Sequence, residues 1–266
     1  MPSVITLTTD FGTGSPYVAQ MKGVILSIEP AAVLVDVTHA IAPQNVRQAA
    51  LVLDDVCDRF PAGTIHVAVI DPGVGTARRI VCCRAGQGLF VGPDNGLFSR
   101  VARRVPPASS FALEDERFWL PTVSATFHGR DIMAPVAARL SQGLDPRQLG
   151  PPVERLVDLD WPEPVVEGEC IRGELIAIDS FGNAVSNISR EHLSRLSKGK
   201  QVHVICGEPA IAAPLVYTYG ERPVGTRVAL IGSGGLLEVA IVGGNAAAEL
   251  HLAVGDRVEV RSGVAN

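Results

Sequence analysis

An aspartate and an arginine seven residues apart make one loop of this sequence the strongest candidate for a reactive site. Asp71 and Arg78 lie in the stretch Asp-Pro-Gly-Val-Gly-Thr-Ala-Arg-Arg at 71–79, directly after an apolar run, and His128 follows in a second polar segment, 127–131. A carboxylate, a fixed cation and a titratable imidazole can together bind a water molecule and bias it toward hydroxide. The alternative is structural: a salt bridge between Asp71 and Arg78 that pins a loop, and a histidine satisfied in the core.

A third polar segment ends the first apolar run, where Asp10 lies in Thr-Thr-Asp-Phe-Gly at 8–12. A carboxylate there can accept two hydrogen bonds from a vicinal diol such as that of ribose, or it can cap the helix that follows. Neither GxGxxG nor GxxxxGK[ST] occurs in the chain, so no phosphate-binding fingerprint is present. The acidic residues and His128 also lack the spacing of a metal site, and no metal is expected.

Short β-branched runs alternate with longer helical patterns from residue 3 to about residue 150. Strands are expected at 4–8, 32–37, 65–70, 80–83 and 89–91, and helices at 17–28, 45–59, 97–104 and 132–142. This alternation is typical of βαβ units and predicts an α/β domain with a central, mainly parallel sheet. The three polar loops are expected to meet at the end of that sheet, where α/β proteins keep their sites.

Prolines in the region 150–164 mark a change of composition, because proline does not fit a helix interior. The sequence therefore predicts an α/β domain at 1–155, a linker at 156–168 and a second domain at 169–266. Strands in the second domain are expected at 170–178, 184–188, 202–206, 227–231, 236–242 and 257–260. Their short spacing predicts a small all-β barrel.

In the predicted second domain, Asp179, Phe181 and Asn183 follow a strand directly. An acid, an aromatic ring and an amide within five residues suit a cationic amine and a stacked purine, although the same residues also fit a hairpin turn. Ser233 lies in a glycine-rich turn that would let backbone groups approach a ligand, or that bends a barrel strand.

Composition limits the kind of partner and the compartment. The net charge is −5 and no cluster of lysine or arginine occurs, which argues against nucleic acid as the main partner. The five cysteines have no disulfide or zinc spacing and indicate reduced thiols in a cytoplasmic protein. The N-terminus has no basic region and no apolar stretch approaches the roughly 18 residues of a membrane span, so neither secretion nor membrane insertion is expected.

Six motifs in order resemble one family, the S-adenosyl-L-methionine hydroxide adenosyltransferases, which are hydrolytic relatives of the S-adenosylmethionine-dependent fluorinase and chlorinase. The motifs are TTDFG at 8–12, DPGVGTARR at 71–79, GPDNGLFS at 92–99, FHGRDIMAP at 127–135, IDSFGNAVSNI at 178–188 and GSGGLLEVAIVGGNAA at 232–247. The resemblance implies an α/β domain, a C-terminal β-barrel domain and a homotrimer. In that homotrimer the active sites lie between the N-domain of one subunit and the C-domain of the next.

The resemblance also implies a reaction. Asp71, Arg78 and His128 match the residues that position and activate water in this family, whereas the halogenating relatives carry other residues at the aspartate and histidine positions. Water would displace methionine from C5′ of the ribose in one SN2 step and give adenosine and L-methionine, without a cofactor. The alternatives are a chlorinase and a protein that binds S-adenosylmethionine or adenosine without turnover.

By the same resemblance, five further residues would hold the substrate. Asp10 would bind the ribose hydroxyls and Asp179 the methionine ammonium. Phe181 and Asn183 would contact the adenine end, and Ser233 the region of the methionine carboxylate.

Overall fold

The computed structural model of the protein describes residues 3–105, 109–196, 201–207 and 211–263. The chain divides into two compact units, Met1–Leu159 and Asp160–Asn266. This division lies within the stretch 156–168 in which the sequence predicts a linker, and the limits of that linker stay a prediction.

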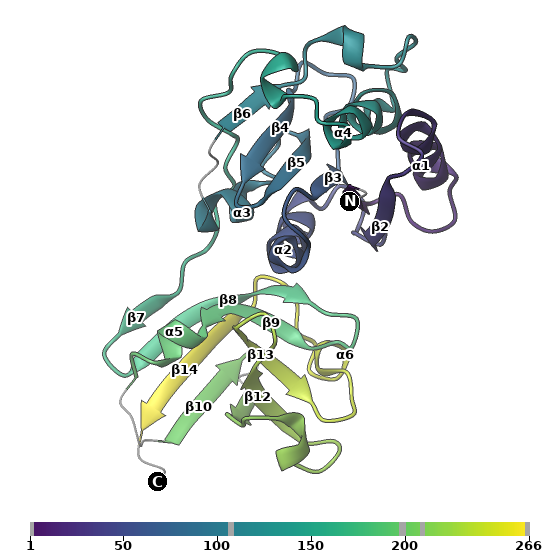
Figure 1. The fold of residues 1–266 in the computed structure, drawn as a ribbon. Coiled ribbons are helices and arrows are strands. Elements are labelled where there is room, and N and C mark those ends of the chain that lie inside the picture. Colours follow the sequence, from purple (N-terminus) through teal and green to yellow (C-terminus); the bar gives the residue numbers. More distant parts are fainter. Residues whose placement is uncertain (1–2, 106–108, 197–200, 208–210, 264–266) are drawn as a thin grey trace. The chain divides into compact units, whose positions relative to one another are not determined.

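A six-stranded mixed sheet forms the centre of the first unit (Figure 1). Its strands are β1 (Val4–Thr9), β2 (Val33–Thr38), β3 (Ile65–Val69), β4 (Ile80–Ala85), β5 (Gly88–Pro93) and β6 (Ser109–Ala112). The order is β2-β1-β3-β5-β4-β6; the first four strands pair in parallel, and β4 pairs antiparallel with both of its neighbours. Only β6 was missed, because half of its residues are serines.

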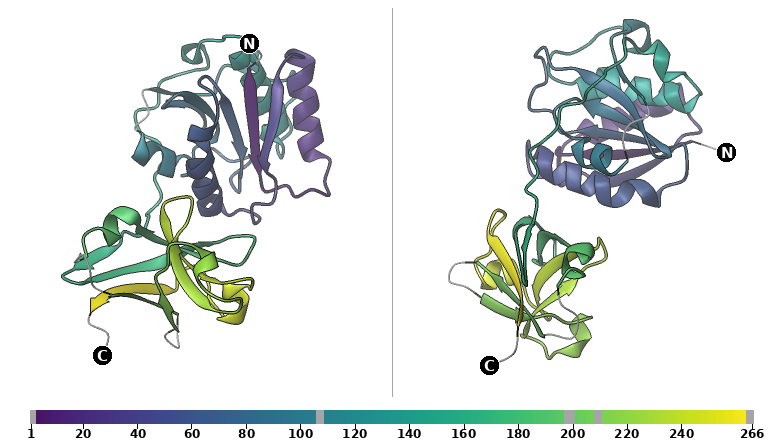
Figure 2. Two further views of the ribbon diagram at one scale, coloured as in Figure 1. Left: turned by 60° about the horizontal axis from the view of Figure 1, so that its bottom comes forward. Right: turned by 90° about the vertical axis from the view of Figure 1, so that its left-hand side faces the viewer.

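Helices cover both faces of this sheet (Figure 2). They are α1 (Tyr17–Ile28), α2 (Val46–Val56), α3 (Ser99–Arg104) and α4 (Ala134–Ser141). Because side chains alternate along a strand, Val67 and Val69 of β3 pack in the core under α1 and α4, while Ala68 packs in the core under α2 and α3. The first unit is therefore a three-layer structure, which confirms the predicted α/β class.

The helix expected at 132–142 has different bounds in the structure. It begins earlier, as the π-helix η3 (Gly129–Met133), and continues as α4 to Ser141. Pro135 has no N–H and cannot bond the carbonyl of Asp131, four residues before it. That carbonyl instead accepts a hydrogen bond from the backbone N–H of Leu120, at 2.9 Å. The proline thus explains why the helix is wide at its start and tied to the preceding loop.

The second unit is a nearly closed antiparallel sheet. Its strands are β7 (Val165–Glu167), β8 (Cys170–Ile178), β9 (Ala184–Ser189), β10 (Gln201–Cys206), β11 (Ile211–Pro214), β12 (Arg227–Ile231), β13 (Leu236–Ile241) and β14 (Arg257–Gly263). Their order is β11-β10-β14-β8-β9-β13-β12, with β7 on β8, and an isolated bridge between Leu215 and Ala229 joins the two ends. The predicted all-β character of this region is confirmed; β7 and β11 were missed because they are short.

All five cysteines are free thiols, as the sequence predicts. Within the described ranges, every helix is too short or too polar to cross a membrane.

Candidate active site

The loop that leaves the carboxyl end of β3 folds back on itself through a bidentate ion pair. Arg78 Nε donates to Asp71 Oδ1 at 2.9 Å, and Arg78 Nη2 donates to Asp71 Oδ2 at 2.5 Å. The side chains are 12% and 6% exposed, so water screens this pair little. Two parallel hydrogen bonds to one carboxylate fix the plane of the guanidinium as well as its position.

His128 shares the same guanidinium. Arg78 Nη2 lies 2.8 Å from His128 Nδ1, and because a guanidinium can only donate, Nδ1 must accept. The neutral imidazole then carries its proton on Nε2. Burial and the neighbouring Arg78 charge lower the pKa of His128 below its ordinary value, which favours this neutral form. The structure therefore brings together all three residues of the predicted water-activating set.

Close backbone approaches hold the two segments in register. Gly75 has a φ of +78°, and a Cβ on it would lie 2.7 Å from the carbonyl oxygen of Ala125. A Cβ on Gly129 would lie 3.0 Å from the side chain of Val69, the last residue of β3. A larger residue at Gly75 would push the Arg78 loop away from Ala125, and one at Gly129 would push the His128 segment away from β3.

Asp10 follows β1, the parallel neighbour of β3. Its Oδ2 accepts a hydrogen bond at 2.8 Å from the backbone N–H of Gln44, a residue with a φ of 64°. The alternative that Asp10 caps the following helix is wrong, because Pro16 occupies the N-cap of α1.

An aromatic contact links the Asp10 loop to the His128 segment. The rings of Phe11 and Phe127 lie edge to face with centroids 5.6 Å apart, and Tyr17 contacts both rings. The residues after β1, after β3 and before η3 are thus neighbours at one edge of the sheet, as the sequence predicts.

In the second unit, Asp179 organises the turn between β8 and β9. Its Oδ1 accepts the backbone N–H groups of Phe181 at 2.8 Å and Asn183 at 2.9 Å, and its Oδ2 accepts from Asn183 Nδ2 at 2.8 Å. The alternative of a hairpin turn is therefore confirmed for these residues. The turn leaves the Phe181 ring 75% exposed, which keeps it available for stacking on a ligand.

Two residues that sequence reasoning missed extend this cluster. Asn183 Nδ2 lies 3.5 Å from the Tyr219 hydroxyl, which donates to Glu238 Oε2 at 3.1 Å. Burial raises the pKa of Tyr219 to about 12, with a further contribution from the Glu238 charge. Burial likewise raises the pKa of Glu238, and the Asp179 charge adds to this.

The glycine-rich turn at 232–235 lies against Glu238. The carboxylate of Glu238 lies where a Cβ on Gly232 would be, so a larger residue at this position would displace the Glu238 side chain. Ser233 lies in the exposed part of the same turn, between β12 and β13.

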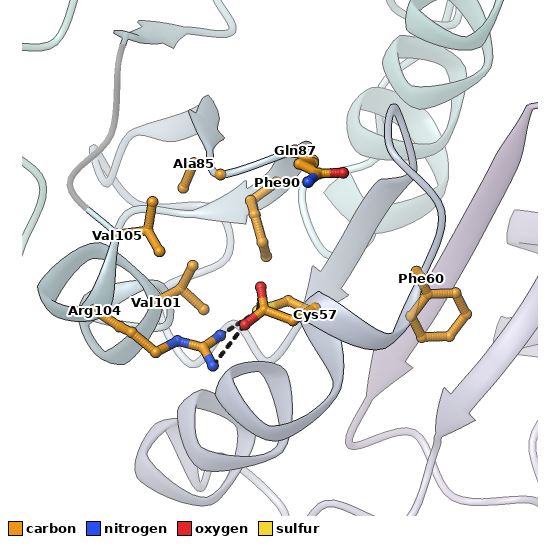
Figure 3. A pocket seen from close by; sticks show the side chains of 11 residues that line it. Cys57, Phe60, Ala85, Gln87, Phe90, Val101, Arg104 and Val105 are labelled. Atoms are coloured by element: carbon orange, nitrogen blue, oxygen red, sulfur yellow. Dashed lines mark hydrogen bonds and ion pairs between the residues drawn. The ribbon is translucent and has the colours of Figure 1, made fainter.

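A cavity of about 230 Å³ lies elsewhere in the first unit (Figure 3). Its walls include Phe60, Phe90, Val101 and Arg104, and Phe60 lies in the segment that enters β3 rather than in the loop that leaves it. None of the predicted site residues lines this cavity. Among the described residues, no three histidine, cysteine, aspartate or glutamate side chains gather in an arrangement that could hold a metal ion.

Comparison with known proteins gives consistent results for both units. Residues 5–150 match the family model described as the SAM hydroxide adenosyltransferase N-terminal domain, and residues 173–259 match the model of the C-terminal domain. A curated (R)-S-adenosyl-L-methionine hydrolase from Thermus thermophilus is 42% identical over 93% of this chain and 95% of its own. A fluorinase from an Actinoplanes species is 29% identical over 89% of this chain and 90% of its own.

Among solved structures, an uncharacterized conserved protein from Thermotoga maritima is similar, with a TM-score of 0.92 and 35% identity. The similarity covers 97% of this chain and 99% of that one. A conserved hypothetical protein from Thermus thermophilus gives a TM-score of 0.77 at 39% identity, covering 98% of this chain and 100% of the other.

Proposed function

The chain belongs to the SAM hydroxide adenosyltransferase family, and on this premise we propose that it hydrolyses S-adenosyl-L-methionine to adenosine and L-methionine. Curated relatives that are named as hydrolases of this compound, at 34–42% identity over nearly the whole chain, support this activity. The observation that carries the proposed mechanism is the single guanidinium of Arg78, which is shared between Asp71 and His128.

The reaction is one displacement at carbon. The oxygen of a water molecule forms a bond to C5′ of the ribose while the C5′–S bond breaks, and the electron pair of that bond neutralises the sulfonium as methionine leaves. The water gives up one proton, so the products are adenosine, L-methionine and H⁺. A held water in line with the C5′–S bond converts a bimolecular attack into an effectively unimolecular one.

The hydrogen bonds of the site divide the work among three side chains. Arg78 supplies the positive charge that stabilises developing hydroxide. Since Nδ1 of His128 accepts from Arg78, Nε2 carries a proton and can orient the water only as a donor. Asp71 keeps lone pairs beyond those that Arg78 uses, and we assign it the role of proton acceptor.

The second unit would hold the other parts of the substrate. Asp179 would bind the methionine ammonium, Phe181 would stack on the adenine, and Asn183 would hydrogen-bond to its edge. Ser233 would contact the methionine carboxylate, while Asp10 of the first unit would bind the ribose diol. The carboxylates of Asp10, Asp71 and Asp179 suit a substrate that carries a sulfonium and an ammonium.

We also infer the setting in which the enzyme works. It would act as a homotrimer whose active sites combine the first unit of one subunit with the second unit of the next, in the cytoplasm and without a metal or other cofactor. Neither nucleic acid nor a membrane would be a partner. These points rest on the family resemblance and on the composition of the chain.

The activity is tested by incubating the purified protein with S-adenosylmethionine in chloride-containing buffer with a chelator and identifying the products by mass. Adenosine and methionine in equal amounts are the expected result. A 5′-chlorinated nucleoside would identify a chlorinase instead, and intact ligand recovered with the protein would identify a binding protein.

A further inference from the structure

A fully buried carboxylate lies three residues after His128. The side chain of Asp131 is 1% exposed and belongs to η3. Its Oδ1 accepts from Arg130 Nε at 2.6 Å and its Oδ2 from Arg130 Nη2 at 3.0 Å. Arg130 in turn reaches α1 through a 2.8 Å hydrogen bond to Gln20. A buried charge is tolerated only when it is paired and hydrogen-bonded, because desolvating it costs free energy. We therefore asked what the Asp131 network does for the site.

Asp131 also clamps the loop that precedes His128. Its Oδ2 accepts the backbone N–H of Ser124 at 2.8 Å, and its backbone carbonyl accepts the N–H of Leu120 at 2.9 Å. One residue of the π-helix therefore holds both ends of the segment 120–124. The opening of the helix at Pro135 frees the second of these acceptors.

The clamped loop is the surface against which the Arg78 loop rests. Ala125 follows Ser124 directly, and its carbonyl oxygen is the atom that Gly75 approaches too closely for any Cβ. Asp131 thus fixes the loop that supports Arg78, and it belongs to the same helix whose N-cap is His128. Asp131 therefore supports both partners of the 2.8 Å contact between Arg78 and His128: Arg78 through the loop, and His128 through the helix.

We propose that Asp131 is a positioning residue, which sets the contact between Arg78 and His128 by clamping the segment 120–124 to the π-helix. It touches neither the water nor the substrate. This inference deepens the proposed function, because it assigns a support to the group that activates water, and it rests on that function only where turnover is measured.

The sign of one pKa change separates positioning from a simple electrostatic effect. Burial and the Arg78 charge lower the pKa of His128, while the charges of Asp71 and Asp131 raise it. Arg130 neutralises part of the Asp131 charge. If Asp131 acted only through its charge, its removal would lower the pKa of His128. If it positions the contact, its removal frees His128 from burial and from Arg78, and the pKa rises toward the ordinary value.

The test is to follow the His128 ring by NMR titration in Asp131→Asn and to measure kcat and KM for S-adenosylmethionine in the same variant. We expect the pKa of His128 to rise and kcat to fall about 10- to 100-fold, with KM changed by less than about threefold. Asp145→Asn is the matched control, because Asp145 also pairs with a nearby arginine, and it should change none of these three quantities.

A second pair of variants covers the case in which Asp131→Asn does not fold. Ser124→Pro removes the N–H that binds Asp131 Oδ2 together with the hydroxyl that contacts Thr126, whereas Ser124→Ala removes the hydroxyl alone, and only the proline variant should show the effects. A fall in the pKa of His128, no change in it, or a rise in KM that matches the loss of kcat would each overturn the proposal. If the wild type does not turn over S-adenosylmethionine, the proposed function fails, while the titration of His128 still decides this inference.

Discussion

The two polar clusters of this protein differ in how their carboxylate charges are balanced. In the first unit, the Asp71 carboxylate and the Arg78 guanidinium compensate each other and His128 is neutral. In the second unit, Asp179 and Glu238 belong to one hydrogen-bonded chain through Asn183 and Tyr219. Among the described residues, no cationic side chain pairs with either of these carboxylates.

This difference indicates a division of labour. A compensated ion pair exerts little net pull on a charged ligand, but its fixed donors and acceptors can stabilise charge that develops during a reaction. Burial raises the pKa of Glu238, the Asp179 charge adds to this, and a cationic ligand would relieve the cost of ionising Glu238. The first cluster is therefore suited to chemistry on water, and the second to holding a substrate with ammonium and sulfonium charges.

The largest effect is expected from the first cluster. Asp71→Asn keeps the shape of the side chain but removes the proton acceptor, so kcat should fall about 100- to 10,000-fold while the Kd for S-adenosylmethionine stays within a few fold. Steady-state kinetics and calorimetry provide both numbers. Asp115→Asn, at another arginine-paired aspartate, is the control. Equal loss of binding and turnover would place Asp71 in the binding machinery and end the contrast between the clusters.

The opposite pattern is expected from the second cluster. Glu238→Gln removes one negative charge and keeps the acceptor for Tyr219, so KM should rise about 10- to 100-fold with little change in kcat, since hydrogen bonds to charged groups contribute about 1.5–3 kcal/mol. Glu167→Gln, at a surface pair with Arg172, should have no effect. A loss confined to kcat would show that Glu238 acts on the reaction rather than on binding.

Asp10 should behave like the binding cluster although it lies in the first unit. Asp10→Ala removes the acceptor assigned to the ribose diol and should weaken S-adenosylmethionine binding about tenfold. Calorimetry with an S-adenosylmethionine analogue that lacks both ribose hydroxyls provides the comparison, because the variant should no longer distinguish it from the natural ligand. Unchanged affinity would contradict the diol assignment.

The smallest effect concerns pH. The neutral form of His128 is the one that fits beside Arg78, and its pKa lies below the ordinary value because of burial and the Arg78 charge. Lowering the pH therefore protonates His128 only below about 6.5, the ordinary imidazole pKa. We expect the acidic limb of the kcat profile to fall in that lower range and to be absent in His128→Gln. A limb at higher pH would mean that His128 is not held as described.

Much of this arrangement could be predicted from the sequence. The alternation of strands and helices is strong where β-branched runs are bounded by Gly and Pro turns, and it places Asp10 and Asp71 at the ends of neighbouring parallel strands. His128 lies close to the loop after β3, because its neighbour Gly129 packs on Val69, the last residue of that strand.

The features that the sequence did not predict depend on contacts between residues distant in sequence. The π-helix follows from Pro135 together with a carbonyl that finds Leu120, and local propensity shows only the proline. Tyr219 and Glu238 join the Asp179 cluster through a chain of side-chain hydrogen bonds that no periodic pattern encodes. The choice between a helix cap and a loop contact for Asp10 likewise required Gln44, 34 residues away.

The most direct test of the account is to run the reaction in water labelled with ¹⁸O and locate the label by mass spectrometry of the products. The account predicts one ¹⁸O atom in the 5′-hydroxyl of adenosine and none in methionine, with the same rate in the presence of a chelator. Adenosine without the label, or a label in methionine, would contradict attack of water at C5′ and with it the role assigned to Asp71, Arg78 and His128.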